Sequence, residues 1–143
     1  MSVGPRFRGR LSYLRARDAS RHGQLPDTDG NGLSAGLIYA PSRRLKLRVE
    51  GERRWVDYDV PALKVDGRGG VAVAGFTRSD RLVVVRAGAQ LYRGRLFDAV
   101  YAFVVTSSNS FGYDYKSHRF CLLHACALPG NVDLQAYLNL QSR

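Results

Sequence analysis

Hydrophobic and polar residues alternate along much of this chain. In the clearest stretch, Leu45, Leu47 and Val49 alternate with Arg44, Lys46 and Arg48. Side chains two residues apart share one face of a β-strand. The pattern therefore predicts a strand with its three apolar side chains facing a core and a row of three cations facing outward.

Other apolar segments also have the length and composition of strands. Strands are predicted at residues 11–16, 35–40, 55–60, 71–76, 82–85, 97–106 and 119–128. Residues 132–140 alternate at period two, although a short helix capped by Asn131 is the alternative. Polar and glycine-rich segments predict a long loop at residues 17–34, turns at Gly51, 66–70 and 129–131, and a loop at 107–118.

This pattern amounts to about eight to ten short strands with frequent turns. It predicts an all-β fold, either a small jelly roll or a distorted barrel. The length of 143 residues favours one domain. We expect residues 1–10 to form a basic N-terminal tail and residues 11–143 to form a single β domain.

The net charge and the lengths of the apolar runs limit the classes of protein to which this chain can belong. The chain has 22 Lys and Arg against 12 Asp and Glu, a formal charge of +10, which favours an anionic partner. No apolar run reaches the ~18 residues of a membrane-spanning helix, and no secretory signal is recognised. Cys121 and Cys126 would lie on opposite faces of a strand, so no disulfide is expected between them. These features predict a soluble intracellular protein, in the cytoplasm or nucleus, without membrane contact.

The candidate binding residues are cations around the clearest strand. They are Arg43, Arg44, Lys46, Arg48, Arg53 and Arg54. Trp55 and Tyr58 lie nearby in the sequence, and aromatic rings among cations suit stacking on bases. A nucleic acid, an acidic protein surface and a merely solvated strand face all remain open.

The sequence predicts no metal site, cofactor or catalytic group. His118, Cys121, His124 and Cys126 do not match a standard zinc spacing, and core thiols with ordinary histidines are the simpler interpretation. Residues 66–70 are glycine-rich, but no helix follows, which favours a hairpin turn over a phosphate loop. The serines of residues 107–110 lack a nucleophile elbow.

Three segments, taken in order and spacing, resemble motifs of the dUTPase family. They are Leu11-Ser12-Tyr13-Leu14 with the later Ser34-Ala35-Gly36, then Tyr92-Arg93-Gly94, then Ser117-His118-Arg119-Phe120-Cys121-Leu122-Leu123. Together they cover about residues 11–127. The resemblance implies a homotrimer with a vestigial nucleotide-site region at Gly36, Tyr92, Arg93 and Gly94.

The departures from the family remove its chemistry. Ala89 stands where the family has the aspartate that activates water, and no carboxylate means no general base. The family's glycine-rich C-terminal arm has no counterpart. In this respect the chain is similar to the dUTPase-derived adenoviral early proteins, which act as adaptors. We therefore expect a non-enzymatic, viral, partner-binding protein, with a basic structural or RNA-binding subunit of a virion or ribonucleoprotein as the alternative.

Overall fold

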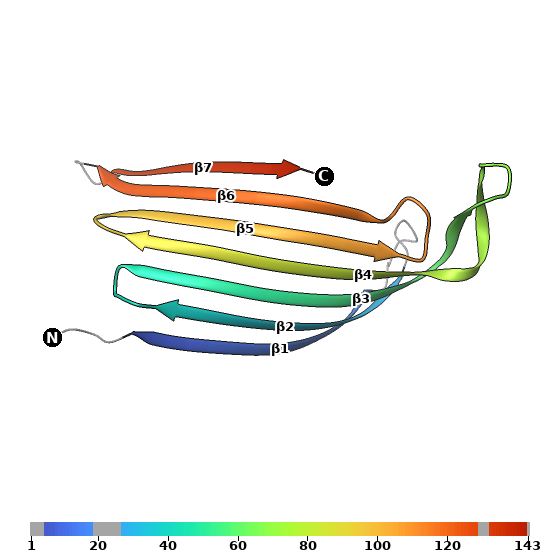
Figure 1. The fold of residues 1–143 in the computed structure, drawn as a ribbon, viewed down its shortest axis with the longest axis horizontal. Helices are drawn as coiled ribbons and strands as arrows, with labels where there is room; N and C mark the ends of the chain where they lie inside the picture. Colours follow the sequence, from blue (N-terminus) through green and yellow to red (C-terminus); the bar gives the residue numbers. More distant parts are fainter. Residues whose placement is uncertain (1–4, 19–26, 129–131, 143) are drawn as a thin grey trace.

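A single antiparallel sheet contains nearly all of the residues that the computed structural model describes, which are 5–18, 27–128 and 132–142 (Figure 1). The strands are β1 (Arg6–Asp18), β2 (Thr28–Ala40), β3 (Leu45–Val65), β4 (Val71–Tyr92), β5 (Arg95–Ser108), β6 (Tyr115–Leu128) and β7 (Val132–Ser142). They follow one another across the sheet in chain order. Each strand therefore pairs with its neighbours in the sequence.

The expected all-β class is confirmed, but the expected jelly roll or distorted barrel of eight to ten short strands is wrong. The described strands form one open sheet of seven, with β1 and β7 at its edges. Their lengths are 11 to 22 residues, where about 5 or 6 is typical. Alternation predicts which side chains share a face, but it does not say whether a strand continues through a polar residue or how a sheet ends.

Several predicted boundaries are wrong for that reason. Gly51 was expected to turn the chain, yet it pairs with Ala35 and Val85 inside one continuous β3. Residues 28–34 belong to β2 rather than to a loop, and residues 6–10 belong to β1 rather than to a tail. The alternative of a short helix after Asn131 is wrong, because Val132–Ser142 forms strand β7. No helix in the described ranges is long and apolar enough to cross a membrane.

Strands β3 and β4 continue past their neighbours as a hairpin that projects beyond the end of the sheet (Figure 1). The pairing shifts register around Pro61, which has no N–H to donate. At the tip, the Asp66 carboxylate accepts hydrogen bonds from the Arg68 and Gly70 N–H groups at 2.9 and 2.7 Å. Gly69 supplies the positive φ of 81°. The predicted hairpin turn at residues 66–70 is confirmed.

Burial within the sheet is sparse. Among the described residues, the buried apolar side chains are Ala62, Ala74, Val84 and Val104. A single sheet has no second layer to cover it, so most of the large apolar side chains are exposed. The location of those side chains decides what the sheet can contact.

Candidate functional site

The pairing register divides the sheet into two faces of different chemistry. Directly paired residues share a face. One row crosses β2 to β7 through Leu37, Val49, Ala87, Tyr101, Phe120 and Leu140. The adjacent row, on the opposite face, contains Gly36, Glu50, Arg86, Ala102, Arg119 and Gln141. We call these the apolar face and the polar face.

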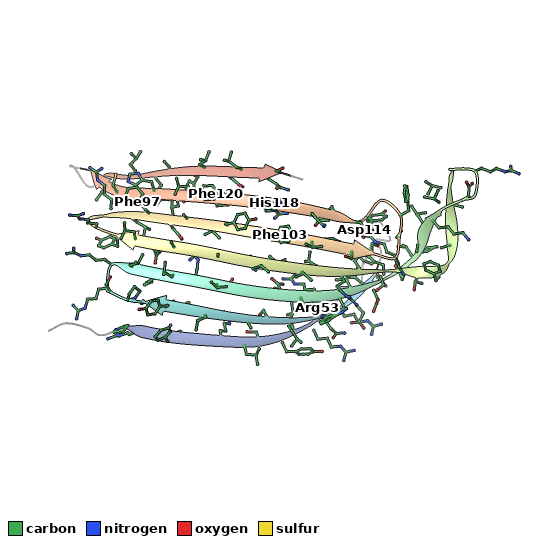
Figure 2. All side chains as sticks on the ribbon, viewed as in Figure 1. Arg53, Phe97, Phe103, Asp114, His118 and Phe120 are labelled. Carbon is green, nitrogen blue, oxygen red and sulfur yellow. The ribbon has the colours of Figure 1, made fainter. Side chains whose placement is uncertain are left out.

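The apolar face is the more exposed of the two. Its large exposed side chains include Phe7, Leu11, Tyr13, Leu33, Leu37, Leu47, Val49, Val85, Leu91, Phe97, Tyr101, Phe120, Leu134, Leu138 and Leu140. Val85 on this face is 45% exposed, whereas its neighbour Val84 on the polar face is 4% exposed. Figure 2 labels Phe97, Phe103 and Phe120, which lie on the adjacent strands β5 and β6. Leu45, Leu47 and Val49, which were expected to face a core, do share one face as predicted, but no second layer covers that face.

Cations and aromatic rings border the apolar face at both ends. At the end with the long hairpin lie Arg15, Arg53, Arg81 and Lys116, and the guanidinium of Arg53 stands 4.6 Å from the centre of the Trp55 ring. At the other end, Phe7 stacks on Tyr39 with 4.5 Å between ring centres. Arg43, Arg44, Arg93 and Arg95 lie in or beside the turns of that end.

The polar face carries a network of ion pairs on its central strands. Glu52 of β3 pairs with Arg54 on its own strand and with Arg86 of β4, the latter at 3.1 Å. Arg48 Nη2 donates to both carboxylate oxygens of Asp98 at 2.8 and 2.9 Å. Ser34 and Arg10 line a hollow of about 240 Å³ beside this network. On these central strands the polar face therefore holds its charges in pairs, as a water-facing surface can.

A second cluster joins the base of the hairpin to the β5–β6 loop. Arg78 lies between the rings of Tyr58 and Tyr113, with its guanidinium 4.3 and 3.5 Å from the ring centres. It also pairs with Asp80, which accepts a hydrogen bond from Ser108 Oγ at 2.6 Å. The loop is bonded back to the hairpin, because Phe111 N–H donates to the Leu63 carbonyl at 2.8 Å. We call Arg78, Asp80, Tyr58, Tyr113 and Ser108 the hairpin clamp.

The clamp shifts the pKa values of its members. Burial opposes ionisation of Asp80, but hydrogen bonds from Arg78 and Ser108 outweigh it and hold the pKa of Asp80 below its usual value. The hydrogen bond to Asp80 raises the pKa of Arg78. Burial, followed by the charge of Asp80, raises the pKa of Tyr58. Asp80 is thus an ionised structural partner rather than a proton donor at neutral pH.

The six predicted binding residues do not form one surface. Lys46, Arg48 and Arg54 lie on the polar face, Arg53 lies on the apolar face, and Arg43 and Arg44 lie in the β2–β3 turn. Arg48 and Arg54 already have carboxylate partners. The predicted alternation was right for Lys46 and Arg48, but the expected free row of cations was wrong at Arg48, because long-range strand pairing brings Asp98 next to it. Arg54 pairs with Glu52, two residues before it in the sequence.

The expected vestigial nucleotide-site region is also dispersed. Gly36 lies inside β2, paired with Glu50, whereas Tyr92, Arg93 and Gly94 form the β4–β5 end and turn. Gly94 has φ 68°, which explains a glycine there. The open sheet is not dUTPase-like.

The histidines and cysteines of β6 form no metal cluster in the part of the chain that the structure describes. Cys121 and Cys126 are free and lie on opposite faces, as expected, but Cys121 is exposed. The hydroxyl of Tyr101 lies 2.7 Å from Nδ1 of His118, and Phe97 packs against His124. Sequence reasoning missed the clamp and the Arg48–Asp98 pair, because Tyr58, Ser108 and Tyr113 are far from Arg78 along the chain and Arg48 is 50 residues from Asp98.

Comparison with protein-family models, with curated proteins and with solved structures gave no match to this chain.

Proposed function

We propose that the apolar face lies against the hydrocarbon of a lipid bilayer while the polar face lines water, so that the chain is a non-enzymatic membrane component. The observation that carries this is the inverted exposure of neighbours such as Val84 and Val85. In a sheet that packs on a protein core in water, the apolar face is the buried one.

The dimensions of the apolar face support this proposal. On β4 it runs from Val83 to Leu91, which corresponds to about 27 Å along the strand. A strand of about 9–11 tilted residues crosses the hydrocarbon of a bilayer. Tyr13 and Trp55 near one end, and Tyr39 and Phe97 near the other, suit the membrane–water interfaces.

The bordering cations favour lipid over a second copy of the sheet. Arg53 and Arg81 stand at one end, and Arg95 at the other. Two such faces packed together would bring the cations of one copy close to those of the other in either orientation, which is unfavourable. At the hairpin end, Asp29 and Asp57 supply only two carboxylates among the described residues of this face, against Arg15, Arg53, Arg81 and Lys116. Lipid phosphates would meet the cations at both ends.

Lipid contact also places a requirement on the edges of the sheet. Unpaired backbone groups cost several kcal/mol each in hydrocarbon. The proposal therefore requires the outer edges of β1 and β7 to pair with strands of further protein.

The expectation of no membrane contact rested on the absence of a long apolar run, and alternating strands present an apolar face without such a run.

A labelling experiment tests the proposal. Single cysteines at positions 85, 86, 87, 89 and 90, with Cys121 and Cys126 changed to Ser, would carry a polarity-sensitive fluorophore in protein reconstituted into vesicles. We expect quenching by lipid-borne quenchers at 85, 87 and 89, and by aqueous quenchers at 86 and 90. The proposal fails if quenching does not alternate between odd and even positions. It also fails if the odd positions are protected from aqueous quenchers to the same extent in protein without lipid as in vesicles.

A second candidate is the partner-binding adaptor function expected from the sequence. The observation that favours it is the exposed apolar surface of the hairpin, where Val65, Val71, Val73 and Phe76 are uncovered. Such a patch suits a protein partner. The expected homotrimer would weigh about three times the 15.9 kDa chain by light scattering, and Val71→Asp with Val73→Asp would dissociate it if the hairpin forms the contact.

A further inference from the structure

A hollow at the turn end of β1, β2 and β3 collects four cations. Arg6 and Arg8 come from β1, Arg43 from the β2–β3 turn and Lys46 from β3, around a space of about 550 Å³. No carboxylate lines this hollow, and none of the four has a carboxylate partner within the described part of the chain. We call these residues the basic hollow.

This absence of acids distinguishes the basic hollow from the other charged sites. Arg48, Arg54, Arg78 and Arg86 all bond to carboxylates. Four cations grouped without a counter-charge repel one another, and an anion in the hollow would relieve that repulsion. The hollow has the size of a small-molecule site.

The geometry points to a phosphate group as the ligand. Three of the four cations are arginines, whose planar guanidinium groups bond two phosphate oxygens at once. Ser42 also lines the hollow. Its Oγ accepts hydrogen bonds from the N–H groups of Arg44 and Leu45, both at 3.2 Å, which leaves its O–H free to donate. We propose that the basic hollow binds the phosphate group of a small molecule, and this does not depend on the lipid contact of the apolar face.

Titration calorimetry of the full chain in zwitterionic detergent, with inorganic pyrophosphate as the probe, tests the proposal. We expect saturable binding that Arg6→Gln with Lys46→Gln weakens by about tenfold or more. The matched control is Arg68→Gln with Arg119→Gln, which removes the same charge from exposed side chains outside the hollow. This control should change the affinity by less than about twofold.

A charge-preserving variant separates binding from folding. Arg6→Lys with Lys46→Arg keeps the charge and should retain most of the binding, and unfolding curves should match among all variants because these side chains are exposed. Flotation with vesicles of phosphatidylglycerol or phosphatidylcholine distinguishes the source of the phosphate. Binding only to phosphatidylglycerol, lost in Arg6→Gln with Lys46→Gln, identifies a lipid headgroup. Equal losses in this variant and in the control with Arg68→Gln and Arg119→Gln, or no saturable binding to either probe, would overturn the proposal.

Discussion

Arg48 of β3 reaches across β4 to bond Asp98 of β5, with one guanidinium nitrogen 2.8 and 2.9 Å from the two carboxylate oxygens. The side chain passes over Gly88, where an added Cβ would stand 2.7 Å from Arg48 Nε. The contact joins three strands on the polar face. It depends on the absence of a side chain at position 88.

We predict that Gly88→Ala destabilises the sheet by about 1–2 kcal/mol, because Arg48 must move and the Ala99 carbonyl oxygen lies 3.2 Å from the new Cβ. Urea unfolding followed by the fluorescence of Trp55 measures the change. Gly51→Ala is the control, since its Cβ would meet nothing within 4 Å. If Gly88→Ala lowers the free energy of unfolding by the same amount in a chain that already carries Asp98→Asn, the substitution does not act through the ion pair.

The hairpin clamp predicts a pH-dependent stability. The pKa of Asp80 lies below its usual value in the folded chain. The contribution of Asp80 to the free energy of unfolding is therefore complete above the unfolded pKa of about 3.9. That contribution is lost as the pH falls through the lower folded pKa. Unfolding free energies measured from pH 5 to pH 2 should decline more steeply for the wild type than for Asp80→Asn. Parallel declines would refute the role of Asp80.

The same clamp predicts the cost of removing one partner at neutral pH. Asp80 is 7% exposed, and Asp80→Asn leaves Arg78 without its charge partner, at a cost of about 3 kcal/mol. Ser108→Ala removes a single hydrogen bond and should cost about 1 kcal/mol. Hydrogen exchange should show faster opening of the hairpin in both variants. A hairpin as protected as in the wild type would mean that the backbone bonds alone hold it.

A charge on the apolar face should act only in the presence of lipid. Ala87→Arg places a cation near the middle of that face, which costs about 2–4 kcal/mol in a bilayer. Gln90→Arg on the polar face, close to Asp98, is the matched control. Vesicle flotation after reconstitution should show reduced incorporation of Ala87→Arg alone. Equal incorporation of both variants would contradict lipid contact at position 87.

We also predict no hydrolysis of dUTP. Ala89 supplies no carboxylate, and it lies on the apolar face. Pyrophosphate release from dUTP with magnesium should stay at background. Turnover of even about 1 s⁻¹, an ordinary enzyme rate, would show that another residue supplies the base.

The sequence by itself determined the all-β class and the two chemistries of the strands. The alternation of Leu47 and Val49 with Lys46 and Arg48 places them on opposite faces in any strand, because side-chain direction has a period of two. Likewise Asp66 and Gly69 specify the hairpin tip through local hydrogen bonds and a positive φ. These are properties of neighbouring residues, and a sequence pattern records them.

The tertiary structure alone decided what those faces meet. Arg48 and Asp98 are 50 residues apart, and their contact depends on the register of three strands. Gly51 was expected to be a turn but lies within a strand, because pairing with Ala35 and Val85 supplies hydrogen bonds on both sides of it. The exposure of Val85 beside the buried Val84 likewise arises only once the sheet is assembled. Local periodicity selects a face, whereas long-range pairing decides whether that face is covered.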